Sequence, residues 1–526
     1  FRGEMRAGPD PRAAVINAVA RVGEPIVFSA GTVIGGVLSL LAATFSLYST
    51  LAVPLLVGVG LMLLAGLTLV PAILAVLGDI VFWPARASAW RDGAGRGWGK
   101  VAARVVRRPA ATLVVGVIGF GLLAAASAGY TAGSLSATVV PPAGSDSALG
   151  NALIMRHFPR SSLSATLIVF RLKQSAWRDT AVLETAQRLL AADSLFTSVS
   201  GSLDPSGVPI TPADYGRLHS KFGPPSATPA TVPAGGQVPG GASTYQAYRA
   251  SAQYITADGD TIAYAVVLAA GAPTTSSATK AVPAIRAAAA SVATALSASA
   301  SGVIGQEASS YDVGQISDRD LRTVIPIAIV VIAVLLALVV RSILAPIYLI
   351  LSIVLSYLAT LGMSVIIFEK MEGQSGLSFI LPLLMFIFLL ALGEDYNILL
   401  MARIRENAGR EPTRVAVAKA VQITGTTITS AGLVLAGTFA ILAVSALGAS
   451  NGGTIVQIGL GLAMGIIIDT FGVRTLLVPA IVVLFGEANW WLPGKPLRAV
   501  RGKASCTESE RGVSPLPVVF RDLSRD

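Results

Sequence analysis

Two carboxylates, a phenol and an amide follow one another within a long apolar stretch of the chain. Residues 377–401 are almost entirely apolar, apart from Glu394, Asp395, Tyr396 and Asn397. About 20 apolar residues are enough for a helix to cross a bilayer, and a charged side chain held there costs at least about 2.5–3.5 kcal/mol. A membrane helix that keeps Asp395 despite this cost is expected to use it.

The chemistry that suits Asp395 and Tyr396 is proton transfer. A carboxyl group in a low-dielectric site holds its proton more tightly than it does in water, so it can take up a proton on one side of a membrane and release it on the other. The phenol of Tyr396 can share the hydrogen bond. A proton crossing about 100 mV yields about 2.3 kcal/mol, which sustains roughly a fifty-fold gradient. The alternative is a carboxylate that a basic residue on the next helix neutralises.

Three further charged residues are candidates for an auxiliary role. Glu394 faces about 100° away from Asp395 on a helix, so we expect it near the lipid boundary or paired with Arg403. Asp469 and Arg474 lie inside the last apolar stretch, but five residues apart they are poorly aligned on an α-helix. They form either a charge network near Asp395 or an internal ion pair that fixes helix packing.

Composition places the chain among polytopic membrane proteins. It is 53% hydrophobic and 13% charged, with a mean hydropathy of +0.70, whereas soluble domains average about 25% charged residues. The net charge of +10 resides in short segments between apolar runs, as the positive-inside rule expects, so a nucleic-acid partner is not indicated. The single cysteine, Cys506, allows no intrachain disulfide, and the two histidines, far apart in sequence, do not favour a histidine metal site.

Eight spans are predicted, with both termini cytoplasmic and the plasma membrane as the location. The predicted parts are residues 1–129 (an amphipathic cytoplasmic segment and three spans), 130–321 (an extracytoplasmic α+β domain), 322–490 (a five-span bundle) and 491–526 (a cytoplasmic tail). The spans are expected at about 25–45, 50–77, 109–129, 322–340, 343–368, 377–401, 422–447 and 454–486.

Two segments between the spans carry distinct patterns. Residues 83–108 are basic and rich in glycine but lack the spacing of a phosphate-binding loop, which predicts a flexible basic linker. Residues 164–172 and 260–270 favour strands, while 180–192 and 280–299 favour helices. This alternation predicts βαβ units in a small α+β domain. Residues 201–243 are rich in glycine and proline and are expected to form a loop or to be partly disordered.

The two ends of the chain repeat one another. Residues 28–32 match 429–433, residues 70–74 match 478–482, and Gly78 matches Gly486 at the same offset. Internal repeats are common in transporters, and copies of equal orientation are related by an axis along the membrane normal. Because the second copy follows an acidic motif and the first begins at Phe1, we expect an upstream helix with its own acidic motif to be encoded elsewhere or lost. Glycines near residues 425–437 and 459–465 predict close helix packing, or less favourably a lipid-sized groove.

These motifs resemble those of a known family. Residues 393–397 and 403–406, together with 469–480, resemble the actinobacterial MMPL transporters of the RND superfamily. Residues 141–144 and 157–159 resemble the start of that family's second outer domain, and the likeness covers about residues 1–490. Family members have twelve spans, two outer domains and an Asp-Tyr pair in the fourth and tenth spans. This chain resembles such a protein from the end of the fourth span onward.

The resemblance implies a polytopic α-helical membrane bundle with an extracytoplasmic α+β porter-like domain. It implies export of lipids or other amphiphiles driven by the proton gradient, with no cofactor, and with Asp395 as proton carrier and Tyr396 as its hydrogen-bond partner. Homo-oligomers or accessory cell-envelope proteins are the implied partners. An enzyme is not expected, because the chain has no nucleophile elbow, no HExxH and no Walker motif. The alternative is a non-transporting membrane scaffold or receptor, or one half of a two-chain transporter.

Overall fold

The computed structural model describes most of the chain in two compact units. It covers residues 1, 4–5, 10–82, 96–133, 146, 149, 153, 165–205, 207–232, 238–374, 376–409, 411–447 and 452–490. One unit combines Phe1–Tyr130, Ile316–Leu447 and Thr454–Asp526, and the other combines Thr131–Gln315 with Gly448–Gly453. The first holds the membrane helices and the second a small sheet, and each is treated by itself below.

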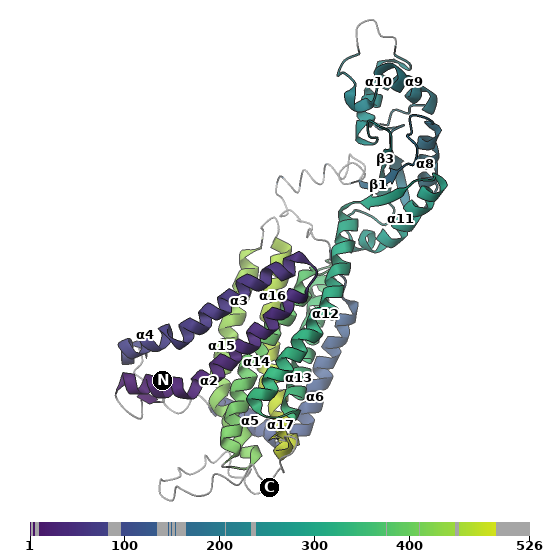
Figure 1. Cartoon of the computed structure of the whole chain (residues 1–526). Helices are drawn as coiled ribbons and strands as arrows, with labels where there is room; N and C mark the ends of the chain where they lie inside the picture. Colours follow the sequence, from purple (N-terminus) through teal and green to yellow (C-terminus); the bar gives the residue numbers. More distant parts are fainter. Residues whose placement is uncertain are drawn as a thin grey trace, which may run out of the picture. The chain divides into compact units, whose positions relative to one another are not determined.

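Eight helical segments of the described residues are long and apolar enough to cross a membrane, which confirms the polytopic α-helical bundle (Figure 1). They are Pro11–Ala42 (α2, Pro11–Leu38, and η1, Ser39–Ala42), Ser46–Leu77 (α3, Ser46–Leu67, and α4, Leu69–Leu77), Pro109–Gly129 (α6, Pro109–Ala126, and η4, Ser127–Gly129), Gln306–Val340 (α12), Leu344–Met371 (α13, Leu344–Ser364, and η8, Val365–Met371), Ile380–Ala408 (α14), Thr413–Ser445 (α15) and Gly452–Trp490. The last segment is composite. It consists of α16 (Gly452–Ile467), the π-helix η9 (Ile468–Leu477), α17 (Val478–Phe485) and η10 (Gly486–Trp490).

Several helices begin well before their apolar stretch. Helix α2 begins at residue 11 rather than 25, α12 at 306 rather than 322 and α15 at 413 rather than 422. At the start of α2, the carboxylate of Asp10 accepts a hydrogen bond from the backbone N–H of Arg12, and Pro11 occupies the first turn. Both are favourable N-terminal signals. Hydropathy locates the part of a helix that suits lipid, while capping decides where the helix starts.

The basic segment before α6 is not simply a flexible linker. Residues 96–107 form α5 (Arg96–Arg107), an amphipathic helix that packs against α15 and α17. Its buried face includes Ala102 and Val106, whereas Arg104 and Arg107 are exposed. The prediction of a flexible linker is therefore wrong for this part, because apolar residues at helical spacing (Ala102, Ala103, Val105 and Val106) give the segment a face to bury. Residues 83–95 lie outside the described residues.

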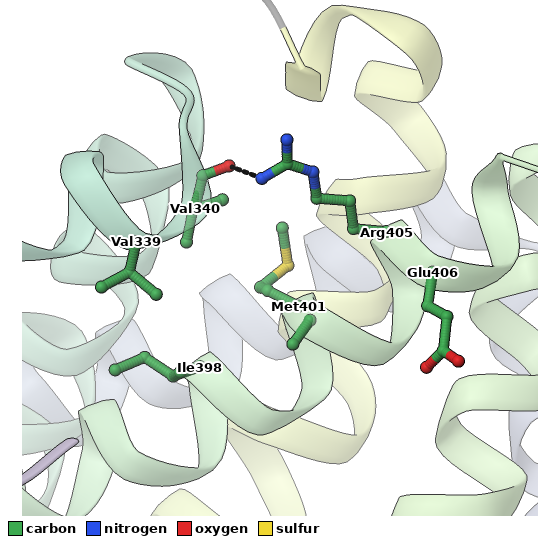
Figure 2. A pocket seen from close by; sticks show the side chains of 7 residues that line it. Val339, Val340, Ile398, Met401, Arg405 and Glu406 are labelled. Carbon is green, nitrogen blue, oxygen red and sulfur yellow. Dashed lines mark hydrogen bonds between the residues drawn. The ribbon is translucent and has the colours of Figure 1, made fainter. Parts of the chain in front are cut away.

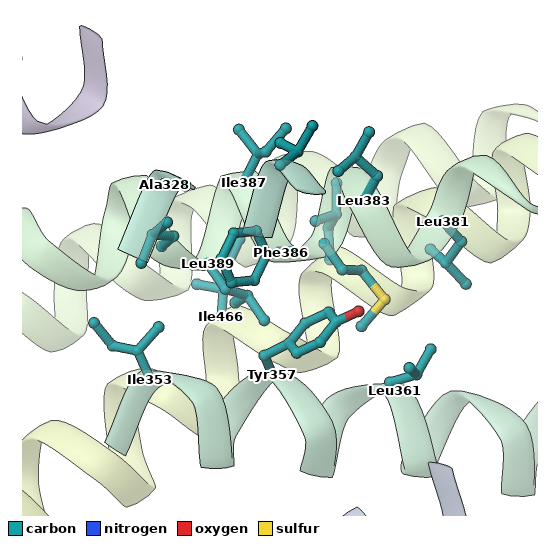
Figure 3. Packing of buried hydrophobic residues seen from close by; sticks show 14 of the residues in the cluster. Ala328, Ile353, Tyr357, Leu361, Leu381, Leu383, Phe386, Ile387, Leu389 and Ile466 are labelled. Atoms are coloured by element: carbon teal, nitrogen blue, oxygen red, sulfur yellow. The ribbon is translucent and has the colours of Figure 1, made fainter. Parts of the chain in front are cut away.

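Helix α14 runs through the middle of the membrane unit and packs against α2, α13 and α15. Around its first half, side chains from α12, α13, α14 and α16 form one apolar cluster (Figure 3). The rings of Tyr357 and Phe386 meet there edge to face, with centroids 5.5 Å apart. Gly465 allows close approach, because a Cβ at this position would lie 3.0 Å from side-chain carbons of Leu389 and Thr360.

The turn between α2 and α3 is fastened to α12 by one buried carboxylate. One oxygen of Asp320 accepts hydrogen bonds from the backbone N–H (2.9 Å) and hydroxyl (2.7 Å) of Thr44, and the other accepts the N–H of Phe45 (2.8 Å). Helix α3 begins one residue later. Asp320 therefore satisfies otherwise unpaired amides at a helix N-terminus, where a negative charge is also favoured by the helix dipole.

The second unit contains an antiparallel sheet with the strand order β2-β3-β1-β4. In chain order, its elements are β1 (Thr166–Arg171), α8 (Ala181–Ala191), β2 (Phe196–Ser200), β3 (Thr261–Leu268), α11 (Ser276–Ala295) and β4 (Ala300–Ile304). Strands β1 and β2 run parallel with β3 between them, and β3 and β4 run parallel with β1 between them. These are two split βαβ units in a ferredoxin-like arrangement, consistent with the predicted α+β class.

Helices α9 (Pro212–Phe222) and α10 (Gly241–Ala250) lie between β2 and β3. The prediction of a loop over 201–243 is therefore wrong for residues 212–222. The hydroxyl of Thr211 accepts the backbone N–H of Asp214, and Pro212 stands in the first turn. A capped start and an apolar face that includes Tyr215 and Leu218 outweigh the many surrounding glycines and prolines.

The sequence repeat also appears in the backbone. Gly78 ends α4 with φ 52° and ψ −124°, and Gly486 ends α17 with φ 53° and ψ −125°. A short 3₁₀ helix follows each glycine. A positive φ is readily adopted only by glycine, so each copy preserves the residue type that its helix end requires.

Candidate functional site

The acidic segment lies within α14. Asp395, the predicted proton carrier, stands between Glu394 and Tyr396 in this helix, but its side chain lies outside the described residues. The relay role of Asp395 therefore stays a prediction. The neighbouring side chains are described and define the surroundings of this segment.

Asp469 and Arg474 form an ion pair inside the bundle. Nη2 of Arg474 donates to Oδ2 of Asp469, and each side chain is only 3% exposed. The pair forms because residues 468–477 are a π-helix, whose hydrogen bonds run from residue i to residue i+5. Two side chains five residues apart point in different directions on an α-helix, but they lie close to the same face of a π-helix. The structure therefore contains the ion pair between these two residues, while a charge network that includes Asp395 stays a prediction.

Tyr396 connects α14 to this ion pair. The guanidinium carbon of Arg474 lies 4.4 Å from the centroid of the Tyr396 ring, within the range of a cation–π contact. The buried hydroxyl of Ser356, on α13, lies beside Asp469. The structure thus brings three of the predicted site residues together, and it adds Ser356, a small polar residue that carries no recognisable sequence signal.

Glu394 is fully buried, so the expectation that it lies near the lipid boundary is wrong. Arg403, the other expected neighbour of Glu394, pairs with a different carboxylate: its Nη1 binds Oε2 of Glu406 at 2.8 Å. Glu394 belongs to the helix face that packs into the bundle. Asn397, one turn further on, is 1% exposed, and neither its amide oxygen nor its amide nitrogen has a hydrogen-bond partner among the described residues.

Glycines let neighbouring helices close around the π-helix. A Cβ on Gly432 of α15 would lie 2.5 Å from Oγ1 of Thr470, and a Cβ on Gly472 would lie 2.3 Å from the ring of Phe120 on α6. Across Gly425, the indole of Trp98 in α5 reaches α15. These contacts favour the close-packing interpretation of the small residues.

The arrangement of Tyr396, Asp469 and Arg474 suits the movement of charge better than the making or breaking of covalent bonds. A carboxylate, a guanidinium and a phenol meet where water is scarce, and π-helical turns are frequent at functional sites. Ionisable groups inside a membrane bundle commonly mark proton relays or ion pathways. The described residues contain no group of three or more His, Cys, Asp or Glu side chains that could hold a metal ion.

Comparisons with known proteins agree with this architecture. The model of the MMPL family matches residues 1–112 and 140–512. ActII-3 of Streptomyces coelicolor, named as a membrane protein, is 32% identical over 495 residues, covering 93% of this chain and 59% of the relative. The sulfolipid-1 exporter MmpL8 of Mycobacterium tuberculosis is 38% identical over 278 residues, or 51% of this chain and 25% of the relative.

A third relative is the apo-petrobactin exporter of Bacillus anthracis, which is 45% identical over 191 residues, or 36% of this chain and 25% of the relative. The chain thus spans between a quarter and about three fifths of the length of these relatives. The family match covers most of both units and seven of the eight candidate spans of the described residues, and it ends at residue 112 in the remaining one, Pro109–Gly129. This multi-pass membrane chain belongs to the MMPL family.

Proposed function

We propose that the chain is part of an exporter that moves lipids or other amphiphiles across the plasma membrane and is driven by the proton-motive force. The observation that carries this proposal is the contact of Tyr396 with the buried Asp469–Arg474 pair, next to Asp395 in the helix. In this proposal Asp395 carries the proton and Tyr396 shares its hydrogen bond. A related protein named a sulfolipid-1 exporter supports an amphiphilic cargo, and one named an apo-petrobactin exporter supports the direction of transport.

Asp469 and Arg474 have a supporting role. When Asp395 gains or loses a proton, the local charge changes by one unit in a medium where charges interact strongly. A cation held against the Tyr396 ring by its own carboxylate can respond without leaving the bundle. Protonation can thereby bias the packing of η9 against α14, and coupling of this kind requires two sites that share one structural element.

Neutralising the proposed proton carrier tests the function. Wild-type transporter and the Asp395→Asn variant are reconstituted in proteoliposomes with an imposed pH gradient, a pH-sensitive dye and a fluorescent phospholipid as cargo. Asp395→Asn is expected to reduce gradient-driven cargo movement and proton flux by at least about tenfold, while the elution profile in detergent stays unchanged. Glu372→Gln, in an exposed loop, is the control. Undiminished gradient-driven export by Asp395→Asn contradicts the proton-carrier role.

The proposed orientation places both termini of this chain in the cytoplasm. Arg341, Arg403, Arg405 and Arg414 lie where α12 and α14 end and α15 begins, which we name the basic end. The positive-inside rule assigns such an end to the cytoplasm. Cys506 is the single cysteine and serves as a probe. A membrane-impermeant maleimide should label it only after the cells are permeabilised, and labelling of intact cells would reverse the orientation.

Sequencing the DNA upstream of the Phe1 codon distinguishes the proposed pump from the alternatives, a scaffold or a two-chain transporter. Under the proposed function, the reading frame continues into an apolar helix that carries its own Asp-Tyr pair. A start codon at or near Phe1 would instead favour the scaffold or the two-chain arrangement.

A further inference from the structure

A cavity opens between the ends of α12 and α14 at the basic end of the bundle (Figure 2). Its volume is about 400 Å³, within the range of small-molecule sites. Its walls are mainly apolar and include Val339 of α12 and Ile398 and Met401 of α14, while Arg405 supplies a positive charge. The cavity thus combines a hydrocarbon-like wall with a cation, and the proton site described above does not use it.

Arg405 is held at the cavity with most of its donors unused. Nη1 donates to the carbonyl oxygen of Val340, the last residue of α12, at 3.1 Å. A guanidinium has five N–H donors, and Arg405 forms no ion pair among the described residues. The adjacent carboxylate, Glu406, binds Arg403 and extends away from Arg405 (Figure 2). One hydrogen bond therefore places the guanidinium of Arg405 at the end of α12, and its remaining N–H groups are able to bind an anion.

A second arginine adds to this charge. Arg341 follows α12 directly, in an exposed turn with φ 51°, and it is the residue next to Val340, whose carbonyl oxygen accepts the hydrogen bond from Arg405. Arg341 likewise forms no ion pair among the described residues. Repulsion between two neighbouring cations that pair with no carboxylate of the described residues is relieved by an anion, and guanidinium groups suit the oxygens of a phosphate.

We propose that this cavity binds an anionic phospholipid, with its phosphate at Arg405 and Arg341 and an acyl chain along Val339, Ile398 and Met401. The apolar walls at the end of two membrane spans favour a lipid over free phosphate, and basic pockets between membrane helices bind anionic headgroups. The site does not depend on the proposed export function. It gives the basic end a specific lipid contact in addition to general attraction to anionic membranes.

Native mass spectrometry of the full chain in detergent tests the proposal, with phosphatidylglycerol and phosphatidylcholine titrated separately. Arg405→Gln and Arg341→Gln should each weaken phosphatidylglycerol binding by about tenfold, the size expected for a lost charge-assisted hydrogen bond, and leave phosphatidylcholine binding unchanged. Arg414→Gln is the matched control, because it removes an exposed arginine from the same end without altering the cavity. Equal losses in Arg405→Gln and Arg414→Gln would overturn the site in favour of diffuse attraction.

A second variant tests the acyl-chain contact without changing charge. Ala402 lines the cavity and is exposed, so Ala402→Phe should fill the cavity without disturbing the bundle, and phosphatidylglycerol binding should fall by a similar factor. Arg405→Lys keeps the charge but loses the fork geometry of the guanidinium. It should therefore bind phosphatidylglycerol more tightly than Arg405→Gln and less tightly than the wild type. Undiminished lipid binding in Ala402→Phe contradicts the acyl-chain contact. Inorganic phosphate that binds alone and displaces phosphatidylglycerol would identify a free-anion site instead.

Discussion

The guanidinium of Arg474 lies against the ring face of Tyr396, with 4.4 Å between the guanidinium carbon and the ring centroid. The two residues come from different membrane helices, α14 and the π-helix η9. Arg474 also donates to Asp469 one π-turn away. One cation thus connects the predicted relay helix to a buried carboxylate.

Breaking the buried ion pair should destabilise the bundle. Arg474→Gln leaves Asp469 as an uncompensated buried charge, and we expect a loss of about 3–5 kcal/mol in the free energy of unfolding. The double variant Asp469→Asn with Arg474→Gln should recover most of it. Arg403→Gln, which breaks an exposed pair with Glu406, should cost less than about 1 kcal/mol. Equilibrium unfolding in mixed micelles measures all three, and a double variant as unstable as the single would contradict this explanation.

The contact of Tyr396 with Arg474 should be visible without transport. Tyr396→Leu removes the ring face and should lower the free energy of unfolding by about 0.5–2 kcal/mol, whereas Tyr396→Phe keeps the face and most of the stability. In combination with Arg474→Gln, the difference between Leu and Phe should shrink. A double-mutant cycle measures this coupling, and a difference that persists without the guanidinium would argue against the cation–π contact.

Two glycines on α15 should respond differently to the same substitution. Gly432→Ala places a methyl group 2.5 Å from Oγ1 of Thr470 and should cost about 1–3 kcal/mol through overpacking. Gly437→Ala meets nothing within 4 Å and should be neutral or stabilising by up to about 1 kcal/mol. Thermal unfolding of both variants in the same detergent gives the comparison. Equal changes in stability at the two positions would contradict the close packing of Gly432 against η9.

Removing the carboxylate of Asp320 should loosen the start of α3. Asp320→Ala leaves the N–H groups of Thr44 and Phe45 without their acceptor, at an expected cost of about 1.5–3 kcal/mol. Hydrogen exchange of residues 44–48 should accelerate while that of the sheet unit stays unchanged. Arg319→Gln, at an exposed neighbour, controls for a substitution at this position of α12, and unchanged protection of residues 44–48 in Asp320→Ala would exclude the capping role.

The stability of the sheet unit should depend on pH through His219. Its ring stacks on Trp177 with centroids 3.7 Å apart, and burial lowers the pKa of His219 below its usual value. The unfolded chain therefore binds the proton more readily, so the stability is fully present above the unfolded pKa of about 6.5 and declines as the pH falls towards the folded pKa.

Thermal unfolding followed by tryptophan fluorescence measures this dependence between about pH 8 and pH 5. His219→Gln should remove this part of the pH dependence. A wild-type unfolding temperature that rises on acidification through this range would reverse the predicted sign.

The sequence by itself determined the membrane class, the eight spans and the approximate position of β1, β3, α8 and α11, because apolar length and alternation are local properties. It also identified the repeat, which the backbone angles of Gly78 and Gly486 reproduce. Strands β2 and β4 escaped prediction because they are short and contain serine, threonine or glycine. Their pairing with β3 and β1 depends on neighbours far away in the chain.

Only the tertiary structure decided how the charged residues of the candidate site meet. The spacing of Asp469 and Arg474 is unfavourable on an α-helix, and it becomes an ion pair because residues 468–477 form a π-helix. In the first copy of the repeat, Leu61 and Gly66 stand at the corresponding distances before Val70, and the chain there forms an ordinary α-helix. The burial of Glu394 and the contact of Tyr396 with Arg474 likewise depend on which helices surround α14. Packing between distant segments, rather than local propensity, sets those contacts.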